Sequence, residues 1–309
     1  MKSRCLCGLF YAFAAFLGSF STSLGQFSEY GSNIYSTMYI GDLTHQNTFI
    51  YSIRAGVGAH FRRHLTRNLS IRSDINLARI SGSDNSPYVR SQTRLGRYSE
   101  FFVVNDAQQL ISSYDPNIYL RNLSFRSILS EATFIFEWKF RELMINSSQP
   151  RANFYFFGGA SVFYFNPEAQ SDSGDLKWFP LKTFTTEGQG TVFYPDVKSY
   201  RSTQIAVPLG LGVRWTLNKF YRFSTELGYR ITFTDYLDDV SGKYVDPLKI
   251  VGTHGNRAGE FVDRSSQLHP YLAGYFKEGS PRGSRGNDAY LFLGFSISRV
   301  IYPYNCPKF

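Results

Sequence analysis

The segment from Tyr221 to Phe233 alternates between apolar and polar residues. One parity holds Tyr221, Phe223, Leu227, Tyr229, Ile231 and Phe233, and the other holds Arg222, Ser224, Glu226, Arg230 and Thr232. Because successive side chains of a strand point to opposite faces, this pattern predicts a β-strand with one apolar and one charged face. Such a strand fits a membrane barrel with lipid outside and a polar lumen inside. It equally fits a soluble sandwich or lipocalin with the faces reversed.

Similar alternation recurs along the chain and predicts eight strands of about 12 residues each. They run from Phe27 to Ile40, Phe49 to Phe61, Leu69 to Ile80, Ile128 to Phe140, Phe154 to Phe165, Gln204 to Leu217, Tyr221 to Phe233 and Asp288 to Ile301. The fifth is apolar on both parities, so its period does not say which face points inward. Pro208 lacks a backbone donor and predicts a bulge or local bend in the sixth strand.

The connections between these strands alternate in length. Those after the second, fourth and sixth strands are short, whereas those after the third, fifth and seventh run to several tens of residues. With an even strand count, all the long loops fall on the side opposite the termini. Short periplasmic turns and long extracellular loops are typical of outer-membrane barrels. We therefore predict an all-β fold, an eight-stranded antiparallel transmembrane β-barrel with short periplasmic turns and three long extracellular loops.

Residues 1–25 have the pattern of a signal peptide. Lys2 and Arg4 precede an apolar stretch, and small residues at Ser23 and Gly25 are typical of a cleavage site. We expect cleavage near Gly25, which leaves residues 26–309 as the barrel domain in the bacterial outer membrane. Of the three cysteines, only Cys306 would then remain, so no internal disulfide is expected.

The formal net charge of +9 suggests an anionic binding partner. The chain has no basic helix and no long run of Lys or Arg, so nucleic acid is not expected. For an exported protein, anionic outer-membrane lipid or lipopolysaccharide is the expected counter-charge.

The polar face of the strands predicts a filled lumen. Eight strands enclose an interior just wide enough for side chains, and buried charges persist when they are paired. The expected charge plug consists of Arg54, Arg62, Arg72, Lys139, Arg214, Arg222 and Arg230 with Asp74, Glu131, Glu137 and Glu226. Gly56, Gly58, Gly210 and Gly212 are expected to make room for these long side chains. The barrel should therefore not conduct.

Catalytic and metal patterns are weak in this chain. Asp235, Asp238 and Asp239 form an oxygen-rich group that could bind Ca²⁺, but they lack the spacing of a calcium loop. A loop anchored by Asx turns and salt bridges is the alternative. His60 and His64 have a zincin-like spacing without the intervening Glu. No Ser/His/Asp arrangement converges at the predicted outer rim, and we predict a non-enzyme without cofactors.

Several motifs together resemble one family. They are YIGDL at Tyr39, RISG at Arg79, RNLSFR at Arg121, FGG at Phe157 with FYFNP at Phe163, TEGQG at Thr186, YRITFTDYLDDV at Tyr229 and YLFLGFS at Tyr290. This combination resembles the DUF6089 family of Bacteroidetes outer-membrane barrels, which includes proteins similar to PorG of the type IX secretion system. The resemblance spans nearly the whole mature chain and implies an eight-stranded outer-membrane barrel. It further implies a structural component that contacts periplasmic lipoproteins.

The resemblance supplies no catalytic residues. If the barrel docks on a periplasmic ring, we expect the short turns to make the contact, with Arg63 and Arg67 as candidates. An alternative places a surface binding module in the outer loops around Tyr194 and Tyr236. A lipid-modifying barrel enzyme is a third hypothesis. We expect the barrel itself to be monomeric.

Overall fold

The computed structural model describes residues 27–44, 49–84, 120–144, 150–171, 177–268, 272–283 and 286–302. The predicted signal peptide and Cys306 lie outside these ranges.

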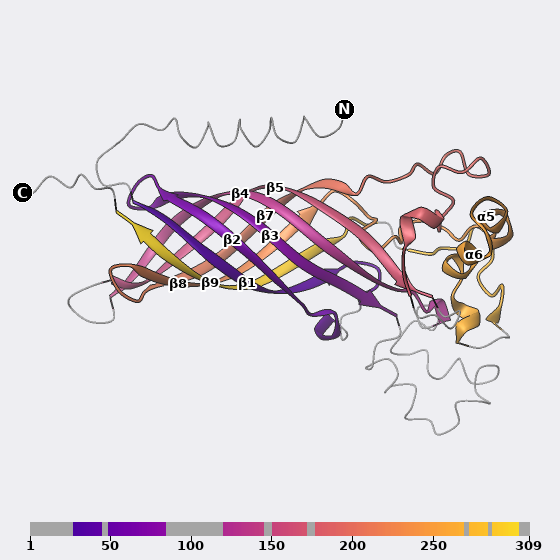
Figure 1. Cartoon of the computed structure of the whole chain (residues 1–309), viewed down its shortest axis with the longest axis horizontal. Helices are drawn as coiled ribbons and strands as arrows, with labels where there is room; N and C mark the ends of the chain where they lie inside the picture. The colour runs from indigo at the N-terminus through magenta and orange to yellow at the C-terminus, as the bar shows by residue number, and fades with distance from the viewer. Residues whose placement is uncertain are drawn as a thin grey trace, which may run out of the picture.

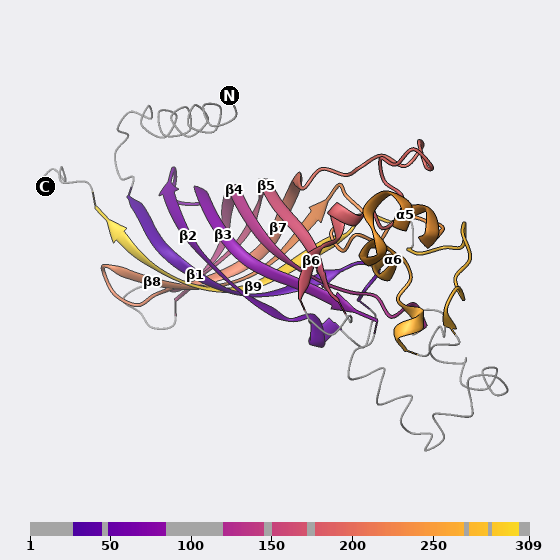
Figure 2. The same ribbon diagram turned by 45° about the vertical axis from the view of Figure 1, so that its right-hand side comes forward.

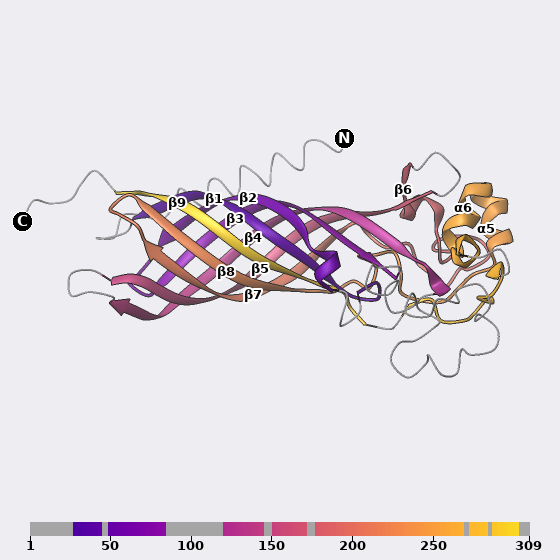
Figure 3. The same ribbon diagram turned by 90° about the horizontal axis from the view of Figure 1, so that it is seen from below.

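The described strands form a closed antiparallel barrel of eight strands (Figure 1, Figure 3). They are β1 (Ser28–Ile40), β2 (Arg54–His64), β3 (Leu69–Ser83), β4 (Ser124–Met144), β5 (Pro150–Gln170), β7 (Thr203–Thr216), β8 (Tyr221–Thr232) and β9 (Ala289–Ile301). Each pairs with its neighbour in the chain, and β1 pairs with β9 to close the ring. A short ninth strand, β6 (Trp178–Pro180), pairs with the end of β5 outside the ring. The predicted strand number and order of the barrel are confirmed.

The second predicted strand begins later than expected. Phe49–Ser52 forms a 3-10 helix, and the ladder between β1 and β2 ends where Thr37 pairs with Arg54. Beyond Thr37, β1 pairs only with β9, so residues before Arg54 have no neighbouring strand on that side. Two strands are longer than predicted. β4 and β5 each have 21 residues, whereas a tilted strand needs ~9–11 residues to cross a bilayer. At the short-turn end β4 continues beyond Trp138, where its pairing with β3 ends, and at the long-loop end β5 continues beyond Tyr164, where its pairing with β7 ends.

The fifth strand, whose facing the sequence left open, turns four aromatic rings inward. Tyr155, Phe157, Phe163 and Phe165 are buried, whereas Phe156 and Tyr164 on the other parity are about half exposed. The neighbouring strands explain this choice, because β7 places Gly210 and Gly212 where the rings of Phe157 and Tyr155 need space. A Cβ at Gly210 would lie 2.3 Å from Phe157 Cζ, and one at Gly212 would lie 2.5 Å from Tyr155 Cζ. These glycines make room for aromatic rings and not, as predicted, for arginines.

Pro208 lies in β7 without the predicted bulge. The pairing of β7 with β8 runs through Pro208 opposite Arg230 with no register shift. On the other side, the pairing with β5 lapses between Gly158 and Ser161 and resumes in the same register. The missing donor of Pro208 is therefore absorbed by a local gap in one ladder.

The outer wall of the barrel is apolar on every strand. Large side chains that are 40–65% exposed project from all eight; among them are Ile34, Val57, Ile75, Phe136, Phe156, Leu211, Leu227 and Phe295. No helix in the described part of the chain is long and apolar enough to cross a membrane.

The long loops fold into a cap beyond one end of the barrel (Figure 1, Figure 2). The cap contains α5 (Pro247–His254), α6 (Asn256–Val262) and the 3-10 helices Leu181–Phe184 and Ser265–Gln267. One buried apolar cluster runs from the barrel interior, at Tyr290 and Phe292, to Leu237, Val240 and Phe261 in the cap. The barrel and the cap therefore share a core.

Candidate functional site

The lumen near the short-turn end contains a network of buried ion pairs. Glu137 on β4 accepts from three arginines: Arg62 Nε at 3.0 Å, Arg72 Nη1 at 2.9 Å and Arg214 Nη2 at 2.7 Å. All four side chains are at most 4% exposed. One carboxylate thus ties together β2, β3, β4 and β7 across the barrel.

A second carboxylate, Glu29 on β1, extends the network toward the turns. It accepts from Arg62 Nη1 at 2.8 Å, from Arg222 Nη1 and from the hydroxyl of Ser298. His64 Nε2 lies 2.7 Å from its other oxygen. Glu29 is not among the predicted plug residues, because the alternation in the first strand is weak.

Two further groups complete the pairing. Glu226 accepts a bidentate pair from Arg72, and Arg72 Nε lies 3.0 Å from Asp74. Higher in the lumen, Arg230 Nε lies 3.5 Å from Glu131, which also accepts from Tyr290 at 2.9 Å. The lumen plug is defined here as Arg62, Arg72, Arg214, Arg222 and Arg230 with Glu29, Asp74, Glu131, Glu137 and Glu226. Five arginines face five carboxylates, so the plug carries no formal net charge.

The structure corrects the predicted plug at Arg54. This side chain is exposed, and its Nη1 donates to the carbonyls of Tyr51 and Ile53 at 3.1 and 2.7 Å. Its parity is that of the lumen, but it stands where the β1–β2 ladder ends, so the guanidinium reaches the 3-10 turn instead. Lys139 is half-buried beside a bulge that separates it from Arg141.

Aromatic rings cover the arginines of the plug on one side. Arg214 Cζ lies 4.5 Å from the ring centre of Tyr155, and Arg230 Cζ lies 4.3 Å from that of Phe292. Above the plug the lumen becomes largely apolar, with Tyr35, Tyr39 and Phe125 joining the shared core. The interior is therefore a charged layer below an aromatic layer, whereas the polar face of the sequence predicted charges throughout.

A serine and a histidine form a row with one carboxylate of the plug. The Ser70 hydroxyl lies 2.7 Å from His64 Nδ1, and His64 Nε2 lies 2.7 Å from Glu29. In a catalytic triad the carboxylate stabilises the imidazolium that forms. Here Glu29 is already paired with two arginines, and Ser70 is only 3% exposed. The row therefore fits a structural hydrogen-bond chain.

At the other end, two of the motifs of the sequence meet inside the cap. Thr186 of TEGQG donates to Asp239 at 2.5 Å, and Glu187 accepts from the backbone of Ser241 and Gly242 at 2.9 and 3.0 Å. Gly188 and Gly190 have φ of 77° and 72°, which favour glycine. The buried Arg282 donates to Thr186, Glu187 and the carbonyl of Asp239.

The acidic residues of the cap are bound by protein donors. Asp235 accepts from the Ser241 hydroxyl, Asp238 from Val240 N in an Asx turn, and Asp239 from Thr186 and Tyr200. Within the described residues, no group of three or more His, Cys, Asp or Glu side chains could hold a metal ion. This geometry fits the alternative of an anchored loop better than a Ca²⁺ site.

Two carboxyl groups share the hydroxyl of Tyr39 at the mouth of the barrel. Tyr39 Oη lies 2.7 Å from Asp238 Oδ2 and 2.8 Å from Asp288 Oδ1. Burial, with Asp42 and Asp235 nearby, raises the pKa of Asp288 to about 8, and burial beside Asp288 raises the pKa of Asp238 well above its usual range. Tyr39 has one proton to donate, so the second short contact requires a protonated carboxyl group.

The residues predicted for periplasmic docking and for binding by the outer loops lie at opposite ends of the molecule. Arg63 is half-buried at the end of β2 and Arg67 is exposed in the turn before β3. Tyr236 stacks on Tyr200 with ring centres 4.8 Å apart and is part of the cap core. Tyr194 donates to Glu278 at 2.7 Å on the cap surface.

No protein-family model matches the chain, and no curated protein matches its sequence. Several solved structures are similar to it. Ail, the attachment invasion locus protein of Yersinia pestis, is 7% identical over 89% of this chain and 99% of that chain, with a TM-score of 0.35. The outer membrane protein OprG from Pseudomonas aeruginosa is 7% identical over 90% of this chain and 97% of that chain, also with a TM-score of 0.35. Neisserial surface protein A is 9% identical over 89% of this chain and 98% of that chain, with a TM-score of 0.34. These scores are low, and the closed barrel of this chain follows from its own strand pairings.

Proposed function

We propose that this protein is a non-enzymatic outer-membrane barrel that acts as a structural or assembly component, similar to PorG of the type IX secretion system. The observation that carries the proposal is the filled lumen. Side chains of the charged layer and the aromatic layer occupy the interior, which favours a structural role over that of a channel or a reaction chamber. Its function then depends on its two ends and its outer wall.

The outer wall supports placement in a membrane. An apolar exterior around a polar, ion-paired interior is the pattern of transmembrane barrels. The predicted signal peptide and the resemblance to the DUF6089 family favour the bacterial outer membrane, with lipid and lipopolysaccharide around the wall. The short-turn end, where β2 turns into β3 and β7 into β8, would face the periplasm, as the predicted loop sorting implies.

Docking at the periplasmic end is the specific role that we propose. Arg63 and Arg67 lie at the β2–β3 turn, where two cations could contact acidic groups of a periplasmic lipoprotein. The test is crosslinking in native membranes, followed by identification of the attached proteins. The charge reversals Arg63→Glu and Arg67→Glu together should reduce the crosslinked lipoproteins.

The matched control reverses two cations at the other end of the molecule. Lys198 and Arg201 are exposed in the segment between β6 and β7, and Lys198→Glu with Arg201→Glu changes the net charge equally. Equal crosslinking in both double variants would contradict docking through the β2–β3 turn.

A binding role of the cap is the second candidate. Val192 is 91% exposed and Leu248 is 78% exposed on the cap, away from the lipid-facing wall. Contiguous exposed apolar patches mark contact sites for partners, whereas single exposed apolar side chains are common, so the two residues are substituted together in the test. If this role is correct, Val192→Ser with Leu248→Ser should abolish capture of surface ligands by intact cells while leaving the periplasmic crosslinks unchanged.

A further inference from the structure

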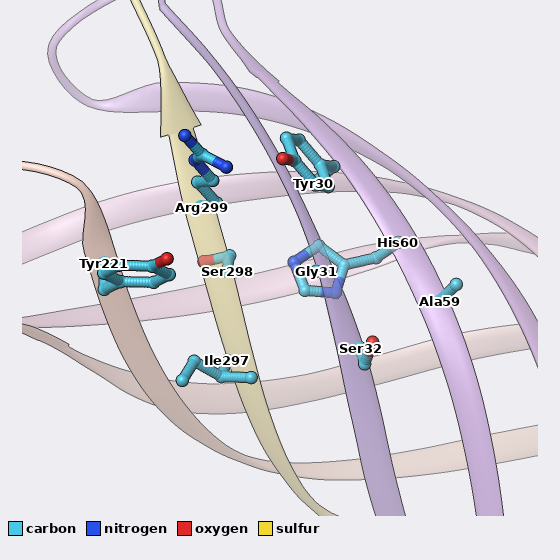
Figure 4. A pocket seen from close by; sticks show the side chains of 9 residues that line it. All are labelled: Tyr30, Gly31, Ser32, Ala59, His60, Tyr221, Ile297, Ser298 and Arg299. Atoms are coloured by element: carbon cyan, nitrogen blue, oxygen red, sulfur yellow. The ribbon is translucent and has the colours of Figure 1, made fainter.

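A hollow interrupts the outer wall near the short-turn end, across β8, β9, β1 and β2 (Figure 4). Its volume is about 520 Å³. The side chains that form its polar rim are Tyr30, Arg299 and Tyr221, each from a different strand. Six of the nine lining residues have the outward parity, and the other three, Gly31, His60 and Ser298, lie beneath them, so the hollow opens on the face that we place in lipid.

The rim is a straight row across three strands. Arg299 on β9 pairs with Tyr30 on β1 and with Tyr221 on β8, so the three side chains point outward side by side. Tyr30 is 45% exposed and Tyr221 is 41% exposed. The guanidinium thus stands between two phenol groups.

Small residues form the floor of the hollow. One step toward the middle of the wall, the outward row consists of Ala59, Ser32 and Ile297. Ala59 and Ser32 stand where neighbouring rows carry the larger Phe61 and Tyr30, or Val57 and Ile34. Beneath them, Gly31 lets its neighbours approach closely, since a Cβ there would lie 2.1 Å from the Ile297 carbonyl oxygen. The missing side-chain volume leaves a trough that runs from Arg299 into the apolar belt.

The charge of Arg299 needs an explanation in this position. The residue is exposed on a lipid-facing wall, two residues before the end of β9, and its side chain forms no ion pair or hydrogen bond with the part of the chain that the structure describes. An arginine on the lipid face costs about 2–4 kcal/mol at the bilayer midplane and about 0–1 near the interface. Arg299 therefore belongs at headgroup level, where an anionic group can pair with it.

We infer that this hollow is a binding site for one phospholipid. The phosphate lies against the Arg299 guanidinium, with the hydroxyls of Tyr30 and Tyr221 on either side, and an acyl chain fills the trough over Ser32 and Ala59. Arginine suits this role because its planar fork can donate two hydrogen bonds to a phosphate. The site goes beyond the docking role, and it requires only that the barrel wall lies in a membrane.

Native mass spectrometry of the full-length protein, delipidated and then titrated with palmitoyl-oleoyl phosphatidylglycerol, tests the inference. The wild type should retain one lipid per chain. Arg299→Gln should weaken retention about tenfold or more, as expected for the loss of a charge-assisted bond. Ala59→Leu, which fills the trough and leaves the charge, should weaken it as well. Arg201→Gln, an exposed arginine of the loops, is the matched control and should bind as the wild type does.

Three outcomes would overturn the inference. Equal retention in Arg299→Gln and the wild type would show that the lipid is held elsewhere. Equal retention of palmitoyl-oleoyl glycerol, which lacks the phosphate, would exclude the headgroup contact. A concentration-dependent dimer that Ala59→Leu abolishes would show that a second copy of the chain, and not a lipid, fills the hollow.

Discussion

Thr186 and Asp239 are 53 residues apart in the chain, yet a hydrogen bond of 2.5 Å joins the hydroxyl of the first to the carboxylate of the second. The bond links the TEGQG and TDYLDD motifs, which in sequence appear as two independent loops. Asp239 is fully buried with φ of 66°, a conformation uncommon for any residue but glycine. The hydrogen bonds that Asp239 accepts and its backbone conformation therefore both hold the two loops of the cap in place.

Removal of the Thr186 hydroxyl should loosen the cap without opening the barrel. Thr186→Val preserves the shape but leaves a buried oxygen of Asp239 short of a donor, a cost of about 1–3 kcal/mol. Hydrogen exchange should become faster over residues 181–200 and 234–245 and stay unchanged in β1 and β9. Thr203→Val, at an exposed threonine, is the control. Unchanged exchange in the cap would contradict the role of this bond.

The cap should become less stable as the pH rises. The pKa of Asp288 is raised to about 8 and that of Asp239 to about 6, so the folded cap retains protons that the unfolded segment releases near pH 4. Its free energy of unfolding should therefore decrease from about pH 4 to about pH 8. Limited proteolysis of the cap at pH 5 and pH 8.5 measures this.

The control for the pH effect is Asp288→Asn, which cannot ionise. This variant should show a smaller difference in proteolysis between the two pH values than the wild type. A cap that resists protease better at pH 8.5 than at pH 5 would refute the assignment.

The lumen plug should block ion flow and stabilise the barrel. In planar bilayers we expect no stable currents of porin size from the wild type. Glu137→Gln leaves Arg62, Arg72 and Arg214 short of one negative charge, and breaking buried pairs of this kind costs about 3–5 kcal/mol. Urea unfolding in detergent should show the loss, while Asp196→Asn, at an exposed residue, should show none. Steady large conductance in the wild type would exclude a filled lumen.

Ser70 should be chemically inert. It lies in a row with His64 and Glu29, but it is buried, and Glu29, the carboxylate that contacts His64, is neutralised by arginines. A fluorophosphonate probe should not label the folded protein. Labelling that disappears in Ser70→Ala would instead reveal an enzyme, and deletion should then alter the mass spectrum of the membrane lipids.

Much of the barrel could be predicted from alternation. Successive side chains of a strand face opposite sides of the sheet, so a strand with one apolar and one polar environment alternates between apolar and polar residues. Tyr221 to Phe233 shows this, since Glu226 and Arg230 are buried on the predicted polar face and Arg222 pairs with the buried Glu29. Alternation does not predict the orientation of Phe154 to Phe165, because both faces of this segment are apolar. Its orientation follows from the glycines of β7, which leave space for aromatic rings on one face only. Arg54 has the right parity but stands where its ladder ends. The cap was beyond prediction, because its contacts join segments far apart in the chain.

The pairing of β1 with β9 has a consequence for biogenesis. Ser28 at the start of the first strand is opposite Ile301 at the end of the last, so the first strand cannot complete its hydrogen bonds until the last one arrives. Contacts of such long sequence separation form slowly, and an open edge is not tolerated in hydrocarbon. The polypeptide must therefore be kept out of the bilayer core, or shielded at its open edge, until β9 has been delivered. Translation and export of the final strand would then set the earliest time at which the barrel can seal.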